Sequence, residues 1–101
     1  MAKKLEPISP GEILLEEFMR PLEISQNQLA RDLGVNPARV HEIVHGRRGI
    51  SAETALRLAA YFRTTPEFWL NLQTRFDLKV AERSHGSAIK KSVRPAVARA
   101  A

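Results

Sequence analysis

The sequence predicts an all-α domain of five helices followed by a flexible basic C-terminal tail. Three observations favour this fold class: short amphipathic segments follow one another, each begins at a helix-capping residue, and no convincing alternating strand pattern occurs. At 101 residues without cysteine, the chain has the size of one small domain that relies on hydrophobic packing rather than on disulfides. We expect the helical domain over residues 1–83 and the tail over residues 84–101.

Capping residues, prolines and a glycine mark the ends of the first two helices. Ser9 and Pro10 open the first helix, and Pro21 ends it. Ser25 is expected to cap the second helix, and Gly34 is expected to stop it. The predicted apolar stripes have helical spacing and consist of Leu14, Leu15, Phe18 and Leu22 in the first helix and of Leu29, Ala30 and Leu33 in the second.

The remaining three helices begin with the same kind of signal. Asn36 and Pro37 start the third helix, Ser51 caps the fourth, and Thr65 starts the fifth, which we expect to end near Arg83. Beyond that point glycine, serine and proline interrupt the periodicity, and small or basic residues replace large apolar ones. The sequence therefore predicts a tail without a core of its own.

The net charge of +5 is distributed unevenly along the chain. Residues 79–101 hold six basic groups against one glutamate, and residues 31–63 hold six against three acidic groups. A local positive field on an otherwise balanced body favours phosphate binding. The tail is compatible with an arm that adds phosphate affinity, a segment that orders on a protein partner, or an inert end. Because no apolar stretch is long enough to span a bilayer or resembles a secretory signal, we expect no membrane contact and a cytoplasmic location.

The segment 26–45 has the spacing of a helix-turn-helix. Two helices cross closely only where a small residue faces the crossing, as Ala30 does, and the sharp turn between them requires a positive φ, which suits Gly34. The third helix then presents an outer polar face. That face contains Arg39, His41, Glu42 and His45, and such a helix fits the major groove of DNA.

The helix-turn-helix resembles that of phage-repressor-like regulators, and the flanking segments extend the likeness. Pro-Gly-Glu-Ile-Leu at 10–14, the segment 51–59 and Phe-Trp-Leu-Asn-Leu-Gln at 68–73 are similar to the HigA (VapI-like) antitoxins. This resemblance covers about residues 8–80. It implies a dimer that represses its own operon at double-stranded operator DNA and that neutralises a RelE-like HigB toxin, a ribosome-dependent enzyme that cleaves messenger RNA. A related helix-turn-helix regulator without a toxin partner is the alternative.

The candidate DNA contacts are the residues of this chain that align with the helix-turn-helix of these families. We expect Arg39 to contribute most, because a guanidinium can bind guanine with two hydrogen bonds. The expected base-reading residues are Gln26, Ala38, Arg39, Glu42 and His45. The expected phosphate contacts are Asn36, Arg47, Arg48 and Ser51, which combine positive charge with the N–H groups of helix starts.

The fifth helix carries more apolar surface than one face of a terminal helix needs. We expect Trp69, Leu70 and Phe76 to contact a second subunit, although a stripe of this kind is also typical of a core within one chain. A dimer would place two recognition helices about 34 Å apart, one turn of DNA, which favours a palindromic operator.

The segment 41–45, His-Glu-Ile-Val-His, matches the H-E-x-x-H pattern of zinc proteases. A catalytic zinc also needs a third protein ligand and a walled cleft, and the remaining histidine, His85, lies in the predicted tail. We therefore expect no metal, no cofactor and no catalytic residue. Ser25, Ser51 and Thr65 are better explained as helix caps than as nucleophiles.

Overall fold

The computed structural model describes residues 6–97, and these contain helices and loops but no strand. The predicted all-α fold is confirmed. The first five residues, and the end of the predicted tail with Arg99, lie outside the described residues. The elements in chain order are α1 (Pro10–Ile13), η1 (Leu14–Met19), α2 (Gln26–Leu33), α3 (Pro37–Val44), α4 (Ala52–Phe62), α5 (Pro66–Ala81), η2 (Glu82–Gly86) and α6 (Ser87–Ser92).

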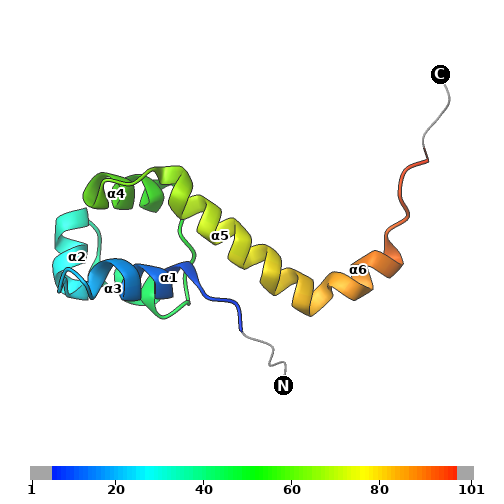
Figure 1. The fold of residues 1–101 in the computed structure, drawn as a ribbon, viewed down its shortest axis with the longest axis horizontal. Coiled ribbons are helices and arrows are strands. Elements are labelled where there is room, and N and C mark those ends of the chain that lie inside the picture. The colour runs from blue at the N-terminus through cyan, green and yellow to red at the C-terminus, as the bar shows by residue number, and fades with distance from the viewer. Residues whose placement is uncertain (1–5, 98–101) are drawn as a thin grey trace.

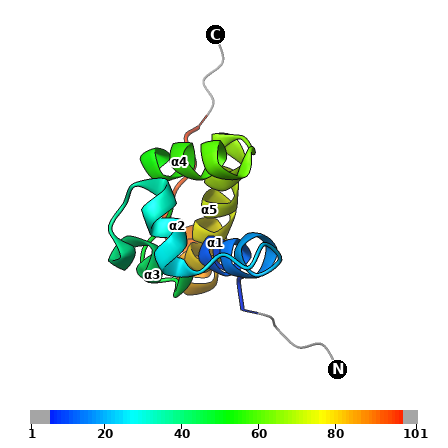
Figure 2. The same ribbon diagram turned by 90° about the vertical axis from the view of Figure 1, so that its left-hand side faces the viewer.

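The first four α-helices gather at one end of the molecule, and α5 leaves this body as a long arm that η2 and α6 continue (Figure 1). Seen from the body end, α4 lies opposite α1 and α3, with α2 and α5 between them (Figure 2). The arm explains a radius of gyration of 17.7 Å. A compact domain of about 100 residues would measure about 13 Å.

The predicted helix starts are confirmed, each by a side-chain oxygen that accepts a hydrogen bond from a backbone N–H of the first turn. The N–H···O distances are 2.8–3.2 Å at Ser9, Ser25, Asn36, Ser51 and Thr65. These caps satisfy N–H groups that have no partner within their helices. They fix the points at which the polypeptide turns, and so the outline of the body.

Trp69 lies at the centre of the core, with none of its surface exposed. Its ring centroid is 4.8 Å from that of Phe18 on η1 and 5.0 Å from that of Phe68. Phe62 at the end of α4 lies 5.1 Å from Phe18 and completes the aromatic cluster. The indole Nε1 donates to Oγ1 of Thr64 at 2.8 Å. This cluster fastens the start of α5 to the body.

The first helix widens into a π-helical turn, which changes the face it buries. The N–H of Arg20 donates to the carbonyl of Leu15, and that of Ile24 to the carbonyl of Met19, both five residues back and both at 2.9 Å. Met19 is consequently 1% exposed, whereas Leu22 is 61% exposed. The predicted place of Leu22 in the apolar stripe is therefore wrong, because that stripe assumed regular α-helical spacing throughout.

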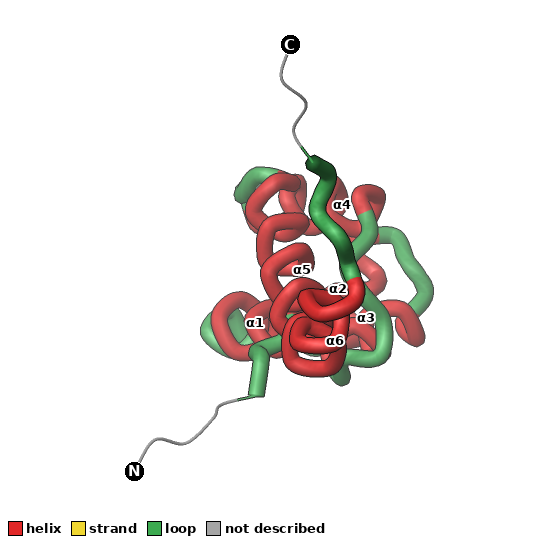
Figure 3. Tube along the Cα trace, turned by 90° about the vertical axis from the view of Figure 1, so that its right-hand side faces the viewer, coloured by secondary structure: helices red, strands yellow, loops and turns green. Residues whose placement is uncertain are grey.

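The C-terminal helix is longer than the sequence predicts. Instead of ending near Arg83, helical structure continues through η2 and α6 to Ser92, and residues 93–97 have no regular secondary structure. Gly86 has helical dihedrals, φ −55° and ψ −46°, so it does not break the helix. Side chains in this segment are exposed, in agreement with the prediction that it forms no core. Figure 3 views the molecule along the arm, with α6 in front.

Candidate nucleic-acid interface

Helix α3 separates an apolar inner face from a polar outer face. Val40 and Ile43 are each 2% exposed and pack into the core. Asn36 caps the helix through Oδ1, which accepts from the N–H of Ala38 at 2.8 Å, and both residues are exposed. The start of α3 is therefore exposed to solvent.

The turn between α2 and α3 has the geometry that the sequence predicts. Gly34 adopts φ 74°, the left-handed conformation, and its N–H bonds to the carbonyls of Ala30 and Arg31. Ala30 is completely buried where the helices cross. From α4, Nη1 of Arg57 donates to the carbonyl of Leu33 at 2.7 Å. The sequence analysis did not single out Arg57, which fastens the helix-turn-helix to α4.

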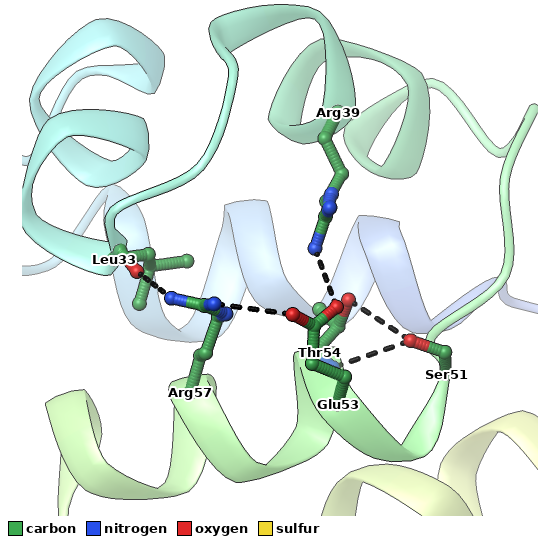
Figure 4. Close-up of polar contacts among 6 residues, drawn as sticks. All are labelled: Leu33, Arg39, Ser51, Glu53, Thr54 and Arg57. Carbon is green, nitrogen blue, oxygen red and sulfur yellow. Dashed lines mark hydrogen bonds and ion pairs between the residues drawn. The ribbon is translucent and has the colours of Figure 1, made fainter.

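Arg39 points from α3 toward the first turn of α4, where it meets Glu53 (Figure 4). Its Nη1 lies 3.0 Å from Oε1 of Glu53, and Nη2 of Arg57 lies 3.1 Å from Oε2. The pKa of the Glu53 carboxyl is lowered, mainly by the hydrogen bond from Arg57 and next by the one from Arg39. The positive charges of both arginines lower it further. Glu53 therefore stays ionised at neutral pH and ties α3 to α4.

A second ion pair connects a predicted base-reading residue with a predicted phosphate contact. Nε of Arg48 donates to Oε1 of Glu42 at 2.8 Å, which joins α3 to the loop that follows it. Both side chains remain well exposed, so the pair is weak.

Gln73 on α5 holds the loop 46–50 in place through a hydrogen bond to its backbone. The N–H of Ile50 donates to Oε1 of Gln73 at 2.7 Å, and Nε2 of Gln73 donates to Oδ1 of Asp77 at 2.9 Å. The loop and the start of α4 line a hollow of about 550 Å³, to which Arg47, Arg48 and Ser51 contribute. The structure thus brings the predicted phosphate contacts of this segment together. Gln73, which ends the segment 68–73, therefore has a structural role in binding this loop.

The histidines of the 41–45 segment contact protein atoms. Nδ1 of His45 donates to the carbonyl of His41 at 2.8 Å, and Nδ1 of His41 lies 3.3 Å from Oε1 of Gln26. Gln26 thereby joins the start of α2 to the outer face of α3. Within residues 6–97 no group of three or more histidine, cysteine, aspartate or glutamate side chains is arranged to hold a metal ion.

Trp69 is wrongly predicted as a dimer contact, because it is fully buried within this chain. Leu70 and Phe76 are half-buried, so part of each side chain is exposed to solvent. Phe76 lines a groove of about 520 Å³ between the N-terminal segment and α5, together with Pro7, Ile8, Ile13 and Leu72. Of the three predicted contacts, only Leu70 and Phe76 stay candidates.

Replacement of Trp69 by phenylalanine tests its structural role. We expect Trp69→Phe to lower the free energy of unfolding by about 1–2 kcal/mol, because it removes the bond to Thr64 and leaves a small void. Thermal unfolding followed by circular dichroism measures this loss. The molar mass from light scattering should not change, and a change in mass would restore Trp69 to an intersubunit contact.

No helix within the described part of the chain is both long enough and apolar enough to cross a bilayer.

Comparison with known proteins gives one consistent family. Residues 15–69 match the helix-turn-helix family. Virulence-associated protein I of Dichelobacter nodosus is 49% identical over 84 residues, which cover 83% of this chain and 78% of that protein. An uncharacterized HTH-type transcriptional regulator of Haemophilus influenzae is 51% identical over 73 residues, covering 72% of this chain and 68% of that protein.

Solved structures share this fold over nine-tenths of the chain or more. The Pseudomonas aeruginosa antitoxin HigA with the higBA promoter superposes with a TM-score of 0.86 at 44% identity, covering 90% of this chain and 99% of the other. The antitoxin GraA in complex with its operator superposes with a TM-score of 0.87 at 51% identity, covering 97% of this chain and 99% of the other. The fold described above is therefore shared with antitoxins that have been solved on DNA.

Proposed function

This chain belongs to the HigA (VapI-like) antitoxin family of helix-turn-helix proteins, and we propose that it represses its own operon by binding operator DNA. The family is a class of DNA-binding regulators and antitoxins rather than a class of enzymes. The observation that carries the proposal is the outer face of α3, where Ala38 is exposed and Arg39 and Glu42 are partly exposed.

In the proposed complex, α3 enters the major groove and its first turns read base edges. Gln26 and His45 both contact His41 on this helix. The loop 46–50 and the capped start of α4 bind phosphates through guanidinium groups and helix N–H groups. Similarity to the promoter-bound HigA and the operator-bound GraA supports this arrangement.

Arg47 is proposed to bind phosphate rather than a base, since it lies exposed in the loop after α3. We expect Arg47→Ala to weaken binding to operator and unrelated DNA by the same factor. Loss of one phosphate contact should also reduce the slope of log K against log salt by about 0.9. Titration of both duplexes at four salt concentrations measures the two effects. A loss confined to the operator would assign Arg47 to base reading instead.

We further propose that the protein acts as a dimer on a palindromic operator. Exposed apolar side chains on α5 support this, with Leu78 57% and Val80 40% exposed beyond the half-buried Phe76. The two recognition helices of such a dimer lie about 34 Å apart, so nuclease footprinting should find two half-sites one helical turn apart. A monomeric mass at micromolar concentration, or a single protected half-site, would contradict the dimer.

The antitoxin role extends the proposal to a protein partner, a RelE-like HigB toxin encoded beside this gene. Family membership supports it. The test is co-expression with the neighbouring small reading frame: an antitoxin relieves the growth arrest and copurifies with the toxin. The relative from Haemophilus influenzae, named as a transcriptional regulator, favours a second candidate, a regulator without a toxin. If this chain does not relieve the growth arrest, the antitoxin role is contradicted and the regulator without a toxin is supported.

A further inference from the structure

The carboxylate of Glu53 lies where a phosphate-binding surface would not be expected to hold one. It stands in the first turn of α4, two residues after Ser51, a proposed phosphate contact. Negative charge at a helix start is favourable for the helix alone, and Glu67 occupies the same position in α5. The same charge repels DNA phosphates. An acidic residue here thus favours the helix but disfavours DNA binding.

What distinguishes Glu53 is that each of its carboxylate oxygens binds an arginine, one from α3 and one from its own helix α4 (Figure 4). Oε2 accepts from Nη2 of Arg57 at 3.1 Å, and Nη1 of that arginine donates to the backbone carbonyl of Leu33 at 2.7 Å. The carboxylate is thus anchored to the backbone at the helix-turn-helix turn. Its other oxygen, Oε1, accepts from Nη1 of Arg39 at 3.0 Å.

The consequence concerns the guanidinium of Arg39. A single ion pair through Nη1 restrains the side chain, which is 29% exposed, without using the Nε and Nη2 edge of the planar group. An unrestrained arginine would lose conformational entropy when it docks on a base, and restraint before binding reduces that loss.

From this geometry, and on the basis of the proposed operator binding, we infer that Glu53 is a positioning residue for sequence selectivity: it holds Arg39 ready for base recognition. Glu53 itself touches no base in this scheme. Its charge weakens binding to any DNA through phosphate repulsion, while its grip on Arg39 strengthens binding to the operator. The first effect acts on every DNA and the second on the operator alone, so a comparison of two duplexes separates them.

The test measures dissociation constants of the full-length protein for two duplexes, the DNA upstream of its gene and a scrambled sequence of equal length. For Glu53→Gln we expect the ratio of the scrambled to the upstream constant to fall at least about fivefold, a share of what one bidentate arginine contact provides. Affinity for the scrambled duplex should stay equal or rise. A loss of folded protein would instead weaken both, and circular dichroism checks that the variant is folded.

Two comparisons complete the experiment. Glu67→Gln removes the same charge from the equivalent position of α5 and should leave the ratio unchanged. In an Arg39→Ala background, Glu53→Gln should have no further effect on the ratio, since the positioned group is gone. An unchanged ratio in the single variant, or an equal fall in the Arg39→Ala background, would overturn the inference while operator binding stands. A wild-type protein that does not prefer the upstream duplex would overturn the proposed function and the inference with it.

Discussion

Gly11→Ala is expected to destabilise the fold by at least about 3 kcal/mol, a fall in the unfolding midpoint of more than about 10 °C. A Cβ atom built on Gly11 would lie 1.7 Å from the carbonyl oxygen of Ile43 and 2.6 Å from its carbonyl carbon. Both atoms belong to the backbone of α3, so no side-chain rotation can relieve the clash. Helix α1 would have to move away from the recognition helix.

Gly86→Ala is the matched control, because Gly86 is also a helical glycine. The nearest atom to its added Cβ would be Cβ of Glu82 at 3.7 Å, an ordinary contact. Helix propensity favours alanine over glycine by about 1 kcal/mol in a helix interior. We therefore expect Gly86→Ala to leave the midpoint unchanged or slightly raised. Thermal unfolding of both variants makes the comparison, and a Gly11→Ala protein as stable as wild type would refute the close approach of α1 to α3.

Arg39→Ala is expected to have the largest effect on DNA recognition. A bidentate contact between arginine and guanine contributes about 1–3 kcal/mol of discrimination, or roughly 5- to 150-fold in affinity. We expect this loss on the operator and a much smaller loss on unrelated DNA. Competition binding with the two duplexes measures the difference.

Arg20→Ala is the control for the loss of one charged arginine. Arg20 forms a similar surface ion pair, with Nε 3.0 Å from Oε2 of Glu16, but directly after η1 rather than on the recognition helix. Its replacement should change binding to both duplexes by the same factor. If Arg39→Ala also lowers both affinities alike, Arg39 contacts phosphate or solvent, and base reading must come from other residues of α3.

The sequence predicts the helix starts because each depends on a local signal. Ser25 and Asn36 bind N–H groups only two or three residues away, so the signal and the structure lie in the same short segment. Gly34 likewise marks its own left-handed turn. The helix-turn-helix and its polar outer face could therefore be predicted without tertiary information.

The contacts that organise the interface join residues far apart in the chain, and no local pattern signals them. Arg57 reaches Leu33, 24 positions away, and Gln73 reaches Ile50, 23 positions away. The partner of Arg39 on α4 depends on how α3 and α4 pack, which the spacing of apolar residues does not specify. The sequence favours a contact of Trp69 with a second subunit for the same reason, since its burial depends on Phe18 and Phe62 from other helices.

The central claim is selective recognition of DNA by α3, and fluorescence anisotropy tests it most directly. The wild-type protein is titrated, with a chelator present, against a labelled duplex from upstream of its own gene and against a scrambled duplex, each at two salt concentrations. We expect tighter binding to the upstream duplex by about a thousandfold or more, and weaker binding to both duplexes at higher salt. Equally weak binding to both duplexes would contradict the claim.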